Sequence, residues 1–173
     1  MVRASDGTEV AHGAVPTPWT VVPTGAELAP ATLREAALAA TAGALEAAPQ
    51  GPVVAAGVTS MAETGVLLDR NGRPVAPAIA WYDARGQAEA DRLAADLGAE
   101  RFSARTGLPV RPLFSIAKYA WLRANHPEAA SAVRWLGVAE WVAHGLGGEQ
   151  VAELSLASRT GLLDLERREW WEE

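Results

Sequence analysis

The sequence GVTSMAETGVLLDRNGRPVAPAIAWYDAR, residues 57–85, contains two apolar runs separated by a turn. The runs Gly65–Asp69 and Pro77–Trp81 each have the length of a strand. Between them lies Asn71-Gly72, a dipeptide typical of two-residue hairpin turns because it tolerates positive φ. Upstream, Pro52–Thr59 is a short β-branched and apolar run, which predicts a buried strand. These patterns predict three strands, the last two antiparallel to each other.

Helical patterns flank this stretch on both sides. Thr32–Ala48 is rich in alanine, leucine and glutamate and ends before Pro49, which predicts a helix. Further predicted helices are Ala84–Leu97, capped by Asp83 and ended by Gly98; Ile116–Ala124, capped by Ser115; a short one opened by Pro127; and Val138–Leu146. Residues 2–11 predict a β-hairpin that turns at Asp6-Gly7, followed by an irregular, proline-rich connection. Strands mixed with helices predict a layered α/β domain.

Composition excludes several classes of function. The chain has 173 residues, enough for one domain, and 49% of them are apolar, which argues against disorder. Its net charge of −6 disfavours nucleic acid and anionic membranes as partners. Cysteine is absent and the three histidines are far apart, so the sequence predicts neither a disulfide nor a zinc site.

Several segments of the chain resemble, in order, those of the FGGY family of carbohydrate kinases. They are the loop and turn at 57–74, the Pro-x-Ile-x-Trp-x-Asp-x-Arg element at 77–85, the helix at 116–123, the segment at 135–149 and the Ser-x-Ala-Ser-x-Thr segment at 155–164. The resemblance implies an α/β fold, a ribonuclease-H-like (actin-like ATPase) lobe with a mixed sheet and flanking helices, truncated at both ends. Residues 1–173 would then be a single partial domain, the substrate-side N-terminal lobe, without the C-terminal ATP-binding lobe.

The same resemblance implies that the complete, cytoplasmic enzyme uses ATP and Mg²⁺ to phosphorylate a hydroxyl of a sugar or polyol. Carboxylates bind such a neutral substrate by accepting hydrogen bonds, and an indole packs against its C–H face. The resemblance places Glu63 and Trp81 in the sugar pocket with Asp83 and Ala62 nearby, while Arg85 holds that loop by pairing with a carboxylate. It assigns no catalytic base, nucleotide contact or metal ligand to this chain, and it leaves a homodimer open for the complete enzyme.

The sequence also departs from the family pattern. Ala62 stands where glycerol-type members carry arginine, and Met61-Ala62-Glu63-Thr64 replaces the Gln-Met-His-Gly loop of xylulose-type members. Neither pattern therefore assigns the substrate. The family's Asp-x-Gly-Thr phosphate turn and the Gly-x-x-Asp context of its catalytic aspartate are absent from the sequence. We therefore expect the isolated chain to be inactive as a kinase.

Without the resemblance, simpler roles suit the same residues. Trp81 would pack in the core at a strand end, Asp83 would cap the next helix, and Glu63 would lie on a solvated loop. One alternative function is a non-catalytic sugar-binding or interaction module. Another is a glycosidase that pairs Glu63 with Asp83, although nothing in their spacing supports it.

Overall fold

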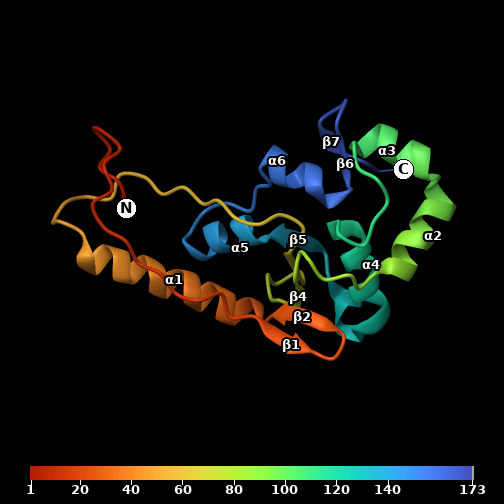
Figure 1. Cartoon of the computed structure of the whole chain (residues 1–173), viewed down its shortest axis with the longest axis horizontal. Coiled ribbons are helices and arrows are strands. Elements are labelled where there is room, and N and C mark those ends of the chain that lie inside the picture. Colours follow the sequence, from red (N-terminus) through yellow and green to blue (C-terminus); the bar gives the residue numbers. More distant parts are fainter. Residues whose placement is uncertain (173) are drawn as a thin grey trace.

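The computed structural model describes residues 1–172, with short strands at the centre and helices around them (Figure 1). The strands are β1 (Thr20–Val22), β2 (Gly25–Leu28), β3 (Gly65–Leu68), β4 (Ala78–Ile79), β5 (Arg134–Gly137), β6 (Leu163–Asp164) and β7 (Glu169–Trp170). The α-helices are α1 (Pro30–Ala47), α2 (Gln87–Leu97), α3 (Ala99–Thr106), α4 (Ser115–Asn125), α5 (Val138–Gly145) and α6 (Leu154–Ala157). Two 3₁₀ helices, η1 (Pro127–Ser131) and η2 (Ser158–Thr160), follow α4 and α6. In this view α1 extends to the left of the strands, and α2 to α4 lie to their right.

The strands form three small antiparallel sheets in the order β1-β2-β4, β3-β5 and β6-β7. The prediction that 65–69 pairs with 77–81 is wrong, because β4 pairs with β2 and β3 pairs with β5. The Asn71-Gly72 turn does form, with Gly72 at φ 75°, but it closes only a single bridge between Leu68 and Pro74. Strand β1 was missed, because the prolines around it suggested an irregular connection.

Strand β3 is buried on both faces and separates two apolar clusters. Val66 and Leu68 face the cluster that contains Leu28 and Trp141, whereas Leu67 faces the cluster formed by β4 and α4. This alternation follows from the two-residue period of a strand. The Trp141 indole donates a 2.8 Å hydrogen bond to the Pro30 carbonyl, which joins α5 to the first turn of α1. The loop before β3 therefore leads into a strand whose four residues are all buried.

Most predicted helices are confirmed, with shifted starts. Helix α1 begins at Pro30, a residue suited to a first helical turn, rather than at Thr32. Helix α2 begins at Gln87 because Gly86 is left-handed, so Asp83 does not cap it as predicted, and Gly98 ends it as predicted. Helix α3 follows at once and was missed. Ser115 is the first residue of α4 rather than its cap, and its hydroxyl bonds elsewhere.

The predicted strand at 52–59 does not form. These residues are an extended coil, seen in Figure 1 as the yellow segment that crosses above α1. Val53 and Val54 are 58% and 75% exposed. A strand requires hydrogen bonds from a neighbour, and within residues 1–172 no strand pairs with this segment. The predicted hairpin at 2–11 is likewise reduced to one bridge, Val2 to Glu9. No helix in the described chain is long and apolar enough to span a membrane.

Candidate functional site

Glu63 lies on the loop that leads into β3 and adopts a left-handed backbone, with φ at 65°. For a residue other than glycine this conformation costs on the order of 1 kcal/mol and persists only where the surroundings impose it. The side chain is 8% exposed, its Oε1 atom accepts a 2.7 Å hydrogen bond from Nε of Arg159, and Nη2 of Arg159 lies 2.7 Å from the same oxygen as an ion pair. Within residues 1–172, no hydrogen bond reaches Oε2. Glu63 is thus a buried, oriented carboxylate with one acceptor atom unused, not a solvated loop residue.

Arg159, in η2, is the residue that orients this carboxylate. Its guanidinium lies 4.9 Å above the Phe114 ring, so that stacking and the ion pair fix it together. The 155–164 segment resembles a segment of the family, but that resemblance assigns no role to Arg159. The two residues are 96 positions apart, and no local pattern signals such a pairing.

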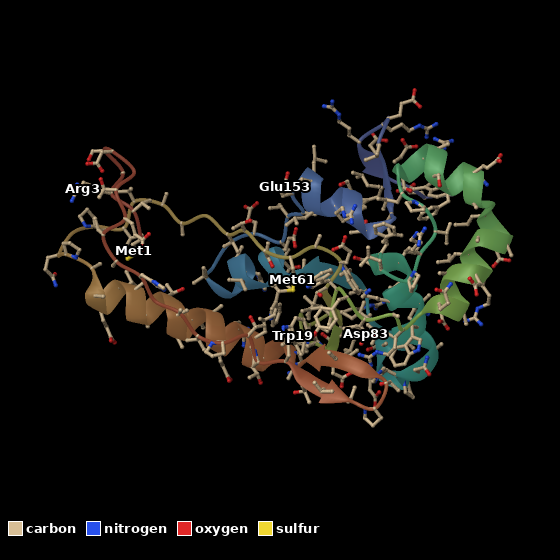
Figure 2. All side chains as sticks on the ribbon, in the orientation of Figure 1. Met1, Arg3, Trp19, Met61, Asp83 and Glu153 are labelled. Atoms are coloured by element: carbon tan, nitrogen blue, oxygen red, sulfur yellow. The ribbon has the colours of Figure 1, made fainter. Side chains whose placement is uncertain are left out.

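Trp81 lies just after β4 and is 45% exposed, so the interpretation of this residue as a core tryptophan is wrong. Its ring meets Tyr82 edge to face, with centroids 5.4 Å apart and planes at 89°. Tyr82 in turn contacts Trp19 at 5.9 Å; Figure 2 labels Trp19 near Asp83 in the centre of the molecule. These three rings form an aromatic patch beside the end of β4. An exposed indole of this kind can pack against an apolar ligand surface.

Asp83 is 6% exposed and holds the loop after Trp81 against β2. Its Oδ2 accepts from the Ala26 amide at 2.8 Å and from Arg85 Nη2 at 2.9 Å, and its Oδ1 accepts from the Arg85 amide at 2.9 Å. Burial alone would raise the pKa of Asp83, but the hydrogen bonds from Arg85 and Ala26 outweigh it and lower the pKa below 3.8. Since both oxygens already accept, Asp83 is an anchor of the loop. A glycosidase that used Asp83 would need a carboxylate oxygen available to the substrate, and both Asp83 oxygens already accept hydrogen bonds within the protein.

Arg85 completes this anchor. Its side chain is 7% exposed, reaches Glu27 at 3.0 Å and stacks on the Trp121 ring at 4.9 Å. Burial alone would lower the pKa of Arg85, but hydrogen bonds to Asp83 and Glu27 raise the pKa above its ordinary value, so the guanidinium remains charged. The predicted pairing of Arg85 with a carboxylate is confirmed. Gly25 is required here, because a Cβ on it would lie 1.9 Å from Asp83 Oδ2.

Helix α4 holds the backbones of both Glu63 and Trp81. Lys118 is completely buried, and its Nζ donates to the carbonyls of Leu113 at 2.7 Å, Pro112 at 2.9 Å, and Trp81 and Asp83 at 3.3 Å each. Burial lowers the pKa of Lys118 to about 8. One turn earlier, Ser115 Oγ donates to the Glu63 carbonyl at 3.3 Å. A single helix therefore fixes two of the predicted site residues.

Ala62 is half-buried and borders, with Glu63, a cavity of about 30 Å³. A larger hollow of about 680 Å³ lies beside the β6-β7 hairpin, and none of the predicted site residues borders it. In that hairpin Asp164 accepts from the Glu166 and Arg167 amides and pairs with Arg105, which is a structural role. Glu63 and Ala62 thus border the smaller cavity, which shares the lining residues Ala152, Ala157 and Trp170 with the larger hollow.

Comparisons with known proteins show which family this chain is similar to. The model of the FGGY family of carbohydrate kinases, N-terminal domain, matches residues 5–173. A glycerol kinase from Clavibacter michiganensis subsp. michiganensis is 40% identical over 132 residues, which are 70% of this chain and 26% of that protein. A gluconokinase from Bacillus subtilis is 30% identical over 149 residues, 86% of this chain and 29% of that protein.

A crystal structure of a xyloylose kinase from Brucella ovis superposes with a TM-score of 0.86 at 27% identity, covering 98% of this chain and 35% of that one. The chain spans 26% and 29% of the lengths of the two curated relatives named above. The similarity confirms the actin-like α/β fold that the sequence implied. With a family match over nearly its whole length, the chain belongs to the FGGY family of carbohydrate kinases and corresponds to the N-terminal domain of that family.

Proposed function

We propose that this chain is the sugar- or polyol-binding part of an ATP-dependent carbohydrate kinase. The observation that carries the proposal is Glu63: a buried carboxylate oriented by Arg159 at 2.7 Å, with Oε2 unused within residues 1–172. A neutral polyol presents hydroxyl donors, and a carboxylate oxygen accepts them. Burial strengthens such a hydrogen bond because little water competes for it. Glu63 is therefore the residue that binds a substrate hydroxyl.

Trp81 supplies the apolar wall of this site. Its half-exposed indole offers a face to the C–H groups of a polyol, and the Lys118 hydrogen bond to its carbonyl limits its movement. Asp83 acts on substrate through the loop it anchors rather than by direct contact, since both its oxygens are engaged. Ala62 contributes only a methyl group, so hydrogen bonds that an arginine would make there are absent from the site.

The phosphate-transfer half of the reaction belongs to parts of the complete enzyme that this chain does not span. A hydroxyl becomes a nucleophile only when a base and a positioned γ-phosphate meet it. We place ATP, Mg²⁺ and that base outside these residues, and propose that the isolated chain binds polyol without turning over ATP. Family membership favours this proposal over a non-catalytic sugar-binding module.

Calorimetry on the 173-residue chain tests the proposal. Glycerol, xylulose and gluconate are titrated separately, and ATP with Mg²⁺ is titrated alone; a coupled assay follows ADP release. We expect at least one polyol to bind, ATP not to bind, and no ADP to form. Glu63→Gln and Trp81→Leu should each weaken polyol binding, whereas Glu35→Gln on the exposed face of α1 should not. Failure of every polyol to bind would overturn the proposal.

A further inference from the structure

A second pair of polar side chains, Thr64 and Glu140, lies next to Glu63 and has no role so far. Both border the cavity of about 30 Å³ that Glu63 and Ala62 also line. Thr64 is 1% exposed and Glu140 is 7% exposed. Within residues 1–172, neither Thr64 Oγ1 nor Glu140 Oε2 has a hydrogen-bond partner. Buried polar atoms without a partner destabilise the fold, so an occupant of the cavity that satisfied them would bind favourably.

Two glycines allow these groups to come together. Gly65 on β3 is paired directly with Gly137 on β5. A Cβ on Gly137 would lie 2.3 Å from Glu140 Oε2, and a Cβ on Gly65 would lie 2.2 Å from the Trp135 ring. The Glu140 carboxylate therefore packs directly against the backbone of Gly137 at the end of β5. The Trp135 ring packs in the same way against Gly65 on β3. Gly137, Trp135 and Glu140 all border the cavity beside Glu63, so the missing Cβ of Gly137 helps to shape it.

The chemistry of the two unpaired atoms identifies the occupant. An ionised carboxylate only accepts hydrogen bonds, whereas a threonine hydroxyl can also donate one. A hydroxyl group supplies both kinds of partner, because its hydrogen can be donated to Glu140 and its oxygen can accept from Thr64. The volume suits a group of that size, since a site needs about 10–15 Å³ to hold a water molecule. A divalent cation does not fit, because Ca²⁺ and Mg²⁺ take about six or more oxygen ligands.

We propose that this cavity receives one hydroxyl group of the sugar or polyol, and that Thr64 and Glu140 determine specificity at that hydroxyl. The inference rests on the proposed function, because the remainder of the ligand must be bound by Glu63. A water molecule has the same hydrogen-bonding chemistry and is the competing occupant. The two occupants can be told apart. Only a substrate hydroxyl makes the affinity for the polyol depend on Thr64 and Glu140, and it does so only at the polyol carbon that carries this hydroxyl.

The test compares the tightest-binding polyol of the calorimetric panel with each of its monodeoxy analogues. For the wild-type chain, we expect one analogue to bind about tenfold or more weakly than the parent polyol. Thr64→Val keeps the shape of the side chain but removes its hydroxyl. In this variant the ratio of the analogue's Kd to that of the parent polyol should fall to within about threefold, because the parent polyol loses its hydrogen bond to Thr64. Thr64→Ser should restore the ratio, and Glu140→Gln should reduce it at the same hydroxyl. Near-ultraviolet circular dichroism checks the fold of each variant.

Different outcomes separate the two proposals. If the polyol binds all variants with the wild-type ratio, the cavity holds water only and this inference is overturned while the proposed function stands. If no polyol binds the wild-type chain, the proposed function fails and this inference fails with it. If Thr64→Val does not fold, Glu140→Gln decides alone: an unchanged ratio in that variant overturns the inference, and a reduced ratio supports it.

Discussion

Arg159 Nε donates a hydrogen bond to Oε1 of Glu63 at 2.7 Å, and Arg159 Nη2 lies 2.7 Å from the same oxygen, across 96 positions of sequence. This contact fixes the direction of the carboxylate and leaves its second oxygen without a hydrogen bond within residues 1–172. Since the Arg159 side chain is 40% exposed, solvent screens the pair and its contribution to stability is small. The contact therefore matters for orientation more than for folding.

We predict that Arg159→Met weakens polyol binding with little change in melting temperature. Losing the guanidinium lets the Glu63 side chain adopt several rotamers, and restoring one of them on binding costs free energy, so the polyol Kd should rise about three- to tenfold. Calorimetry and thermal unfolding of the same preparation measure both effects. Arg70→Met, at an exposed turn, is the matched control. An unchanged Kd in Arg159→Met would refute the orienting role.

Glu63→Gly should separate stability from binding. Glycine adopts φ near 65° without steric cost, which returns about 1 kcal/mol and offsets much of the lost ion pair. We expect an unfolding free energy within about 1 kcal/mol of wild type and no measurable polyol binding. Urea unfolding and calorimetry check the pair of outcomes. Retained polyol affinity in a folded Glu63→Gly chain would exclude Glu63 as a binding residue.

The sequence permitted prediction of features governed by neighbouring residues. Gly98 ends α2 and Pro127 opens η1, because backbone conformations at these residues depend little on the rest of the chain. The segment 52–59 has the composition of a strand but no pairing partner within residues 1–172, and composition carries no information about that partner. Asp83 shows the same limit: a helix cap and a buried anchor to Ala26 look identical in sequence.

The candidate site residues came from the family resemblance, and their geometry could not be predicted from the sequence. The residues alone favoured a solvated loop position for Glu63 and a core position for Trp81. Their common support by α4, through Ser115 and Lys118, depends on contacts across 52 and 37 positions. No periodicity or turn signal spans such separations, so the sequence could not indicate what orients them.

Lys118→Met should destabilise the fold by roughly 2–4 kcal/mol, because carbonyls around the buried Nζ lose their donor. The pH dependence gives a sharper check. The folded-state pKa of about 8 lies below the ordinary value of 10.5, so between these values the unfolded chain binds more protons. Wild-type stability should therefore rise relative to Lys118→Met as pH increases through this window. Urea unfolding of both proteins across this pH window measures the difference in unfolding free energy. A decrease in this difference with rising pH would contradict the lowered pKa of Lys118.

Asp83→Asn should cost about 3 kcal/mol at neutral pH, since it removes one of the two carboxylates that pair with the buried Arg85 guanidinium. The Asp83 pKa is lowered below 3.8, so its stabilising effect is present above that value and is lost as pH falls through the folded-state pKa. The stability difference between wild type and Asp83→Asn should consequently shrink in strong acid. Asp96→Asn, on the exposed face of α2, is the control. A difference independent of pH would contradict the lowered pKa of Asp83.

The most direct test of the central claim is an NMR titration of the 173-residue chain with the polyols of the calorimetric panel. The indole N–H signal of Trp81 is assigned by its loss in Trp81→Phe, and the buried Trp141 serves as an internal reference. We predict saturable shifts of the Trp81 indole signal and the Glu63 amide with at least one polyol, and none for Trp141. If saturating amounts of every polyol shift neither Trp81 nor Glu63, this chain does not carry the sugar-binding wall.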